Sequence, residues 1–277
     1  MIARFLLIFL LSAAGVGAGT LVQFRTTVGD FDVELFDTEK PLTTKNFLRY
    51  VQDGLYTNMI LHRAVSNFVI QGGGVFVANR GTTNVGWQYI PTYAPISNEF
   101  KVGPFRTNAY GTIAMAKTSD PNSATSQFFF NLANNSASLD NTNNSGGFTV
   151  FGRIVSGTNI LNRFNLRPPN TTIKVLNLGS VLSEAPVLYS ANPNFVTYDD
   201  LIYCDVSLLN LLVAQSNNVR QVSWNSVSNK INYVEFTTNY PPVWQSLTNR
   251  TGDGSTLTIN DSATNSARRF YRVRVTY

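Results

Sequence analysis

The run that most restricts the fold of this chain covers residues 61–74 and reads LHRAVSNFVIQGGG. Its centre, residues 68–70, is apolar and β-prone between turn residues, which predicts a short, largely buried strand. Arg63 precedes this strand, and a guanidinium beside buried apolar surface is costly unless it reaches water or a cleft with polar partners. The three glycines after Gln71 permit backbone conformations that other residues rarely adopt.

A second run, residues 111–131, reads GTIAMAKTSDPNSATSQFFFN and consists of an apolar strand, a polar loop and another strand. Side chains of a strand alternate between its two faces. Gln127 and Phe129 therefore share one face, while Phe128 and Phe130 share the other. We expect one aromatic face to enter the core and the other to line a pocket beside an amide.

Composition excludes several classes of enzyme. The chain has 277 residues, of which 43% are hydrophobic, so it can bury one medium core and a smaller one. With one Cys, Cys204, it can form neither an internal disulfide nor a Cys-rich zinc site. A Ser-His-Asp hydrolase would need the single His, His62, and the G-x-S-x-G motif is missing from the sequence. An enzyme here would work by shape, hydrogen bonds and one cation, with no cofactor or metal.

The N-terminus reads as a secretory signal over residues 1–18. Arg4 gives a positive start, residues 5–11 are apolar, and Val16-Gly17-Ala18 fits a cleavage site after Ala18. The alternative is an uncleaved membrane anchor, but the apolar run is short for a spanning helix. We therefore expect an exported protein, periplasmic or extracellular after cleavage, without a stable membrane anchor.

The following residues predict many short strands and two helices. One helix starts at Pro41, runs to about Gln52 and stops at Gly54, and a second covers residues 159–164. Residues 173–182 alternate well enough to be the closing strand of the domain. Between these elements, residues 134–147 read as a polar loop. Short strands with two helices indicate an antiparallel barrel or sandwich.

A second β region follows a looser stretch at residues 184–194. We expect a signal peptide at 1–18, a main domain at 19–183, a linker or the first part of a second domain at 184–217, and a small C-terminal β domain at 218–277. The last domain would be a marginal β-sandwich, because about sixty residues bury little core.

Residues from about 21 to 182 resemble the cyclophilin family of peptidyl-prolyl isomerases. The motifs that carry the resemblance, in family order, are Gly54-Leu55-Tyr56, Leu61-His62-Arg63, residues 68–73 (FVIQGG), residues 111–116 (GTIAMA), residues 126–129 (SQFF), Leu139-Asp140 and Val150-Phe151-Gly152. The resemblance implies a mainly β fold, an eight-stranded antiparallel barrel capped by two helices. The small C-terminal β-sandwich-like domain lies outside it.

The resemblance also implies roles for single residues. Arg63 matches the catalytic Arg of the family. The positions matching substrate contacts are His62, Phe68, Val69, Gln71, Ala116, Lys117, Gln127, Phe129, Leu139 and Phe148. Those that match the pocket for the substrate proline are Phe68, Val69, Phe129 and Leu139. The backbone at Ala116 and Lys117 would pair with the bound peptide, Gln71 would lie beside the Arg, and His62 would be mainly structural.

Two departures from the family pattern lie at the rim of the expected pocket. Ser138 stands where the family often has Trp or Phe, and Phe148 stands where His or Tyr is frequent. The loop between them, residues 141–147, is unusually rich in Asn and Gly. These changes leave Arg63 intact but alter the rim, and with it the expected sensitivity to the family's cyclic-peptide inhibitor.

The sequence therefore predicts a peptidyl-prolyl cis-trans isomerase acting on X-Pro bonds of exported or unfolded polypeptides. Arg63 would stabilise the twisted imide without covalent chemistry. The alternative is a non-catalytic module that binds proline-containing peptides and carries a surface-retention domain. For the C-terminal region, adhesion, surface retention, sorting and simple stabilisation remain open. We expect a monomer that does not bind nucleic acid, because the net charge of +5 forms no basic stripe.

Overall fold

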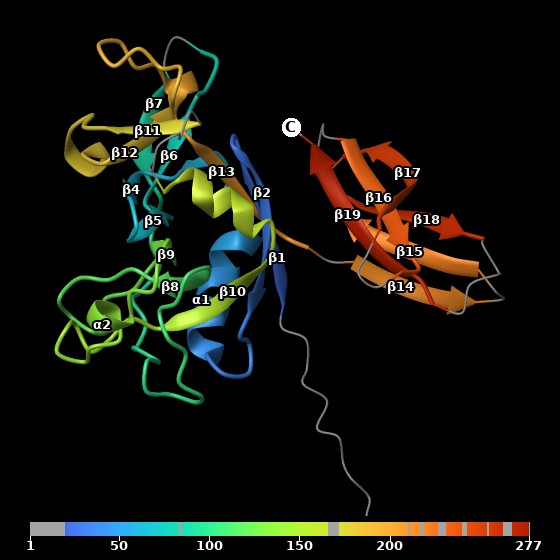
Figure 1. The fold of residues 1–277 in the computed structure, drawn as a ribbon, viewed down its shortest axis with the longest axis horizontal. Coiled ribbons are helices and arrows are strands. Elements are labelled where there is room, and N and C mark those ends of the chain that lie inside the picture. Colours follow the sequence, from blue (N-terminus) through green and yellow to red (C-terminus); the bar gives the residue numbers. More distant parts are fainter. Residues whose placement is uncertain are drawn as a thin grey trace, which may run out of the picture.

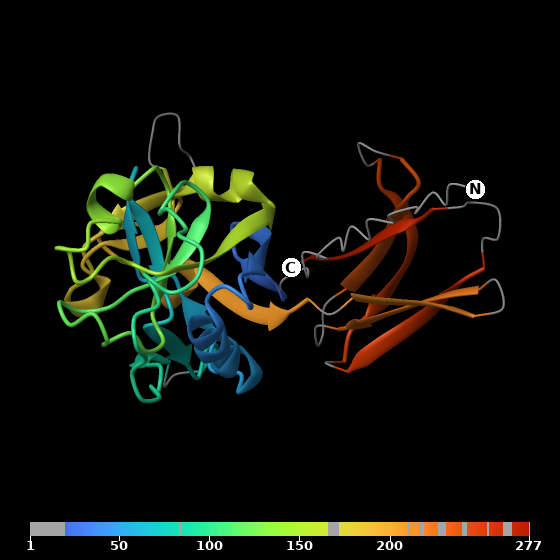
Figure 2. The ribbon, with the colours of Figure 1, turned by 90° about the horizontal axis from the view of Figure 1, so that it is seen from below.

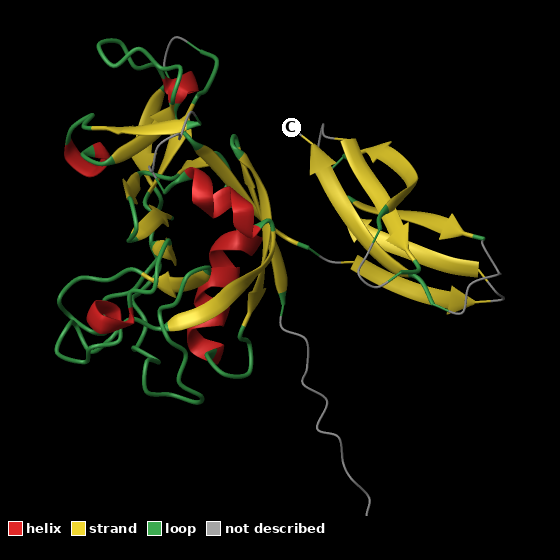
Figure 3. Ribbon diagram, in the orientation of Figure 1, coloured by secondary structure: helices red, strands yellow, loops and turns green. Residues whose placement is uncertain are grey.

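The computed structural model describes residues 20–82, 85–165, 172–209, 211–216, 219–226, 231–239, 243–253, 255–262 and 268–276. The expected signal peptide, residues 1–18, lies outside these ranges. Strands dominate the described chain, and its helices are few, as Figure 3 shows. None of the described helices is long and apolar enough to cross a lipid bilayer.

Most strands of the N-terminal part belong to one antiparallel sheet (Figure 1). Among the described residues it has eleven strands, in the order β4-β5-β9-β8-β10-β2-β1-β13-β3-β6-β7. Their bounds are β1 Leu21–Thr26, β2 Gly29–Leu35, β3 Met59–Ile60, β4 Arg63–Val65, β5 Val69–Gly72, β6 Val75–Ala78, β7 Gly86–Tyr89, β8 Thr112–Met115, β9 Phe128–Asn131, β10 Val150–Ser156 and β13 Tyr203–Leu208.

This sheet curls because two of its strands are broken in the middle. Residues 61–62 separate β3 from β4, and residues 73–74 separate β5 from β6. β4 and β5 lie at one end of the strand order, whereas β3 and β6 lie near the other. Each broken strand therefore connects the two ends of the sheet, which confirms the predicted fold class. Gly73 makes one break possible: its φ is +78°, and a Cβ there would lie 2.4 Å from the Ser126 carbonyl oxygen.

Aromatic rings fill the interior of the curled sheet. Phe24 and Phe31, opposite each other on β1 and β2, stack with their ring centroids 5.1 Å apart. From β9, Phe128 and Phe130 make edge contacts with Phe24, at centroid distances of 5.6 and 5.0 Å. The prediction that one face of the FFF run enters the core is confirmed, because both rings are buried there.

The first predicted helix is α1, Pro41–Gln52, and it buries Phe47, Tyr50 and Val51 against the core. Its first turn is held by Glu99, whose carboxylate accepts hydrogen bonds from the backbone N–H groups of Leu42 and Thr43 at 3.1 and 2.7 Å. A carboxylate suits this position because the N–H groups of a first turn lack partners within the helix.

The remaining helices are short. They are α2 Ser136–Leu139 and three 3₁₀ helices, η1 Thr158–Arg163, η2 Ser180–Leu182 and η3 Tyr198–Asp200. The second predicted helix corresponds to η1, which is a 3₁₀ helix. The polar stretch at residues 134–147 contains α2, which its polar composition did not predict.

The closing strand predicted at residues 173–182 is wrong. Residues there form β11 (Ile173–Leu176), which pairs with β12 (Ala185–Leu188) in a separate two-stranded sheet. β13 instead pairs with β1 on one side and β3 on the other. Both segments alternate apolar and polar side chains, so the pattern alone does not separate them. β13 takes the place in the sheet with Cys204 and Val206 buried in the main core.

Residues 172–202, which we call the side segment, pack against the barrel between η1 and β13. A separate apolar cluster, the side cluster, holds them there. Its buried members are Ile60, Val75 and Val77 of the barrel, with Leu182, Ala185, Val187, Ala191, Leu201 and Tyr203. Ala185, Val187, Ala191 and Leu201, from the stretch expected to be a linker or the first part of a second domain, thus pack against β3 and β6.

The C-terminal strands form a second body beside the barrel (Figures 1 and 2). In the described part, two three-stranded antiparallel sheets have the orders β14-β15-β18 and β17-β16-β19. Their bounds are β14 Leu211–Ser216, β15 Val219–Asn225, β16 Ile231–Thr237, β17 Gln245–Thr251, β18 Thr256–Asp261 and β19 Phe270–Thr276. Val222, Trp224, Val234 and Val273 are buried in one cluster, which agrees with the expected small β-sandwich.

Candidate active site

A row of side chains crosses the curled sheet from strand to strand. In the register of the sheet, Arg63 of β4 is opposite Gln71 of β5, and Gln71 is opposite Phe129 of β9. Phe129 is opposite Ala114 of β8, and Ala114 is opposite Val150 of β10. Residues that face each other across paired strands project on the same side of the sheet. The pairing therefore sets a cation, an amide and an apolar surface next to one another on one face.

The apolar part of this row belongs to a cluster distinct from the main core. Its buried members are Val69, Ala114, Phe129, Leu139 and Val150, and Phe36, Phe68, Ala116 and Phe148 pack against them while partly exposed. The rings of Phe129 and Phe148 meet edge to face with centroids 5.8 Å apart. We call this group of residues the apolar pocket, after the proline pocket that the family resemblance implies for Phe68, Val69, Phe129 and Leu139. Its partly exposed members present apolar surface on which a small ring from another molecule can pack.

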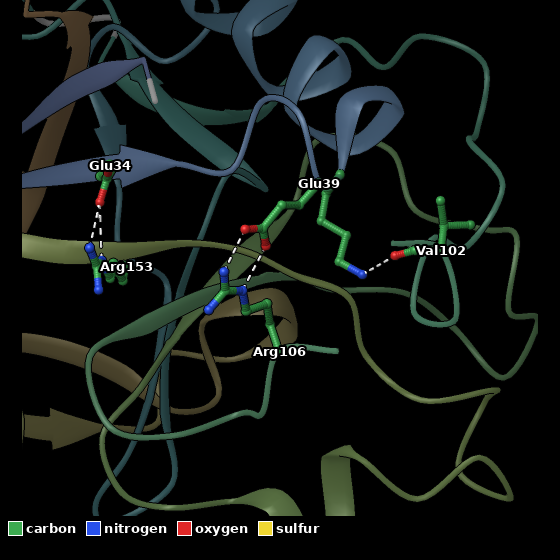
Figure 4. Close-up of polar contacts among 6 residues, drawn as sticks. Glu34, Glu39, Val102, Arg106 and Arg153 are labelled. Atoms are coloured by element: carbon green, nitrogen blue, oxygen red, sulfur yellow. Dashed lines mark hydrogen bonds and ion pairs between the residues drawn. The ribbon is translucent and has the colours of Figure 1, made fainter. Parts of the chain in front are cut away.

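Phe36, at one side of the pocket, is held by charged neighbours. The guanidinium of Arg106 lies 4.9 Å from the centroid of the Phe36 ring. Figure 4 shows this guanidinium meeting the Glu39 carboxylate, with a distance of 2.6 Å from Nε to Oε2. The hydrogen bond from Arg106 lowers the pKa of Glu39. The next residue, the buried Lys40, donates from its ammonium to the carbonyl of Val102. Arg106, held by Glu39, therefore helps to fix the ring of Phe36.

Two polar contacts lie at the other end of the row. Arg63 donates from Nε to Oε2 of Glu184, at 2.6 Å, and their side chains are 36% and 44% exposed. Gln71 donates from Nε2 to Oε1 of Gln127, at 2.8 Å. The two amides are therefore oriented by each other, and the guanidinium is held by a carboxylate from the side segment.

His62 lies in the break between β3 and β4, next to Arg63, and is only 2% exposed. Burial, and to a lesser degree the charge of Arg63, lower its pKa to about 4, although contacts with Gln127 and the Ile60 backbone act in the opposite direction. Within the described residues, Nδ1 of this imidazole has no hydrogen-bond partner. A Cβ on residue 74 would come within 2.9 Å of the ring, so Gly74 leaves room for it. The neutral, covered imidazole favours a structural role.

Lys117 covers the rim of the pocket. Its ammonium lies 4.0 Å from the centroid of the Phe148 ring and donates to the Ser145 carbonyl. Burial lowers the pKa of Lys117 to about 8, although Asp120 acts to raise it. The backbone N–H of Ala116 donates to the Gln127 carbonyl at 2.9 Å. Attraction between a cation and an aromatic ring helps to fix the position of Phe148.

A buried network of amides positions the loop that carries Leu139 and Phe148. Asn108 donates to Asp140 at 2.7 Å and to the Phe148 carbonyl at 3.0 Å. Asn131 donates to Asn108 at 3.1 Å, and Asn135 donates to Asn131 at 2.8 Å. Buried amides are retained where all of their hydrogen bonds are satisfied. The loop is therefore tied to β9 rather than loosely attached, in spite of its Asn-rich sequence.

Comparisons with known proteins agree with this geometry. The family model for cyclophilin type peptidyl-prolyl cis-trans isomerases matches residues 21–180. This chain belongs to that family. A peptidyl-prolyl cis-trans isomerase of Acinetobacter baylyi is 39% identical over 162 residues, which are 58% of this chain and 80% of that protein. Peptidyl-prolyl cis-trans isomerase B of Escherichia coli is 39% identical over 149 residues, 52% of this chain and 82% of that protein. A Streptomyces antibioticus isomerase is 43% identical over 143 residues, 50% of this chain and 80% of that protein.

The cyclophilin domain brings the predicted site residues together. Phe68, Val69, Phe129, Leu139, Ala116 and Phe148 share the apolar pocket, and Arg63, Gln71 and Gln127 lie along or next to its row. Lys117 lies at the rim, and His62 lies beneath the surface. Their individual roles in binding or catalysis stay predictions.

Sequence reasoning missed several residues of the cyclophilin site. Ala114 and Val150 follow from strand alternation once the pairing of β8 with β10 is known. Phe36 and Asn108 come from loops next to strands, and nothing in their local sequence marks them. Glu184 is 121 residues away from its partner, Arg63, in a stretch that reads as a linker.

Proposed function

We propose that the cyclophilin domain isomerises X-Pro bonds of exported or unfolded polypeptides, with Arg63 as the catalytic residue and without a covalent intermediate. The observation that supports this most is the row from Arg63 through Gln71 to Phe129, which lies next to a half-exposed apolar pocket. The pocket would hold the proline ring, and the guanidinium would lie within reach of the imide that precedes it.

The reaction requires rotation about a bond and needs no nucleophile. The barrier to rotation about a peptide bond is about 18–20 kcal/mol, and uncatalysed X-Pro exchange takes about 10–100 s. In the twisted state, resonance is lost and the imide nitrogen becomes basic. Arg63 would donate to this nitrogen or to the proline carbonyl oxygen. An Arg suits the role because it stays charged and has a planar set of donors.

The interaction energies available to such a site are large enough to account for catalysis. A hydrogen bond to a charged group contributes about 1.5–3 kcal/mol, and each ~1.4 kcal/mol of selective stabilisation gives a tenfold rate. Two or three contacts specific to the twisted state would thus supply several powers of ten. Packing of the proline ring against Phe68, Val69 and Phe129 would exclude water and strengthen these contacts.

The other predicted contacts would orient the peptide. Gln71 and Gln127 fix each other and would offer their remaining amide groups to the peptide backbone. The N–H of Ala116 is already engaged by Gln127, which leaves its carbonyl and the Lys117 backbone to pair with the substrate. Leu139 and Phe148 would close the far side of the ring pocket.

The test is NMR exchange of a short X-Pro peptide with residues 19–277, with Arg63→Ala and with Arg153→Ala. Arg153 is a matched control, because it pairs with Glu34 at 2.9 Å on β2 and β10, outside the row (Figure 4). We expect the Arg63 variant to lose at least about tenfold in rate, the equivalent of one lost charged hydrogen bond, and the control to match the parent. A folded parent that binds the peptide without accelerating exchange would support the binding-module alternative instead.

We also propose export through cleavage of residues 1–18. The support is the sequence itself, with Arg4, the apolar residues 5–11 and the small residues up to Ala18. Expression of the full chain in a bacterium, followed by fractionation and N-terminal sequencing, tests this. We expect a mature protein that begins at Gly19 and is found outside the cytoplasm, whereas a full-length product in the membrane fraction would contradict the proposal.

Strand pairing favours a domain boundary between residues 209 and 211. β13 pairs with β1 in the main sheet, whereas β14, which begins at Leu211, pairs with β15 in the C-terminal body. We therefore place the side segment and β13 with the isomerase domain and the strands from β14 onward with the small C-terminal domain.

A further inference from the structure

The contact between Arg63 and Glu184 links the row of the active site to the side segment. Arg63 belongs to β4, which is at the end of the strand order of the main sheet. The backbone N–H of Ala64, on the same strand, donates to the Glu184 carbonyl at 2.8 Å. Glu184 thus contacts this strand twice, once through its backbone and once through its carboxylate. The backbone contact covers an N–H that an edge strand would otherwise expose.

Glu184 is held in place independently of its side chain. Its neighbours Leu182 and Ala185 are buried in the side cluster, 5% and 1% exposed. β12 begins directly after Glu184 and pairs with β11. Because packing and backbone hydrogen bonds determine the position of the main chain here, a change in the carboxylate alone is expected to leave the side segment in place.

The position of the Glu184 contact on the Arg63 guanidinium determines which N–H donors remain available to a substrate. A guanidinium has five N–H donors, one on Nε and four on the two terminal nitrogens. The recorded contact is at Nε, at 2.6 Å. It therefore engages the donor closest to the Arg63 stem and leaves the terminal nitrogens for another acceptor. A carboxylate at Nε also restricts rotation of the side chain, which is otherwise free to occupy many rotamers.

We propose that Glu184 is a positioning residue, which holds Arg63 by Nε and presents the terminal nitrogens of its guanidinium to the bound X-Pro segment. This inference rests on the proposed catalytic role of Arg63. Fixing a catalytic group before the substrate arrives removes part of the ordering that the transition state would otherwise require. Both side chains are half exposed, so the effect is modest, and we expect about three- to tenfold in rate.

The main competing possibility is that the carboxylate blocks Arg63. A Glu that competes with substrate for the guanidinium would lower activity, and its removal would raise the rate. The two ideas therefore predict opposite signs for the same substitution, which makes the experiment decisive.

The test compares Glu184→Gln and Glu184→Ala with Asp199→Asn in residues 19–277. Asp199 is a matched control in the same side segment, because it pairs with Arg80 at 3.3 Å through an exposed carboxylate. With an uncharged X-Pro peptide, we expect kcat to fall about three- to tenfold in both Glu184 variants with KM changed less than about twofold. The control is expected to match the parent in both constants and in thermal unfolding.

Two further measurements follow the contact itself. The Nε–Hε resonance of Arg63, assigned by its absence in Arg63→Lys, is expected to shift in Glu184→Gln and to stay in place in Asp199→Asn. Salt is expected to lower kcat of the parent, because salt at about 1 M screens the half-exposed pair of Arg63 and Glu184. This second measurement uses the parent protein and does not depend on how well a variant folds.

The outcomes distinguish a failure of the positioning role of Glu184 from a failure of the proposed isomerase function. A parent that is active and sensitive to Arg63→Ala, combined with unchanged or higher kcat in Glu184→Gln, would overturn the positioning role alone. A kcat of the parent that does not respond to salt would count against it as well. A parent without activity would overturn the proposed function, on which this inference rests.

Discussion

The pH dependence of the free energy of unfolding tests whether His62 is buried and neutral, because the chain contains a single His. In the folded protein the pKa of His62 is lowered to about 4, chiefly by burial. In an unfolded chain an imidazole titrates near 6.5. Between these values the unfolded state binds a proton that the folded state refuses. The free energy of unfolding is therefore highest above pH 6.5 and falls as the pH is lowered toward 4.

The magnitude follows from the two pKa values. Each pKa unit corresponds to about 1.4 kcal/mol, so the complete loss from this group is about 3 kcal/mol. Most of it, about 2 kcal/mol, is lost already between pH 7 and pH 5. In this range carboxylates of ordinary pKa contribute less, which leaves His62 as the main expected cause.

The assay is urea unfolding at pH 7 and pH 5 for the parent and for His62→Gln, whose side chain does not titrate. We expect the variant to lack about 2 kcal/mol of the pH-dependent loss, whatever its stability at pH 7. The single imidazole resonance in the NMR spectrum should also titrate near pH 4 in the folded protein. A folded pKa near 6.5, or equal losses in parent and variant, would refute the conclusion that His62 is held neutral by burial.

Further predictions concern packing and domain limits. Phe128→Ala removes a fully buried ring among other aromatic rings, so we expect a loss of about 3–5 kcal/mol in urea unfolding. Gly147→Ala should cost more than about 1 kcal/mol and raise KM, because its φ is +77° and a Cβ would lie 2.7 Å from a phenylalanine ring. Gly81→Ala, with φ +80° but an open surrounding, should cost less, and equal costs would deny the clash. A chain ending at residue 209 should fold and stay active, whereas one ending at residue 183 lacks β13 and should not fold. Circular dichroism and peptide exchange measure both properties, and the reverse outcome would contradict the strand assignment.

Local sequence patterns predicted much of the fold. Alternation in the FFF run separated Phe128 and Phe130, which enter the core, from Phe129, which lines the pocket. Pro41 and Gly54 marked the ends of α1 because proline fits a first helical turn and glycine adopts the left-handed conformation after a last one. The motifs of the family resemblance also named Arg63, Gln71 and Phe129, which the strand pairing sets side by side, while their roles stay predictions.

What the sequence did not reveal depends on partners far along the chain. β11 and β13 have similar alternation, and only the pairing with β1 decides which of them closes the sheet. Glu184 meets Arg63 because the side segment folds back, and no short-range rule links residues 121 positions apart. The hydrogen-bond network around Asn108 was likewise not predicted, because a buried Asn and an exposed loop Asn look alike in sequence.

The pairing of β1 with β13 also sets the time at which the barrel can form during synthesis. Thr26 faces Cys204, so the partner of the first strand is made 178 residues later. At about 5–20 residues per second, this delay is roughly 10 to 35 s, comparable with one uncatalysed X-Pro isomerisation. Until then the β1–β2 hairpin has an open edge that other nascent chains can join. A ribosome carrying this chain therefore holds an aggregation-prone hairpin for most of the elongation time, and crowded polysomes should increase its misassembly.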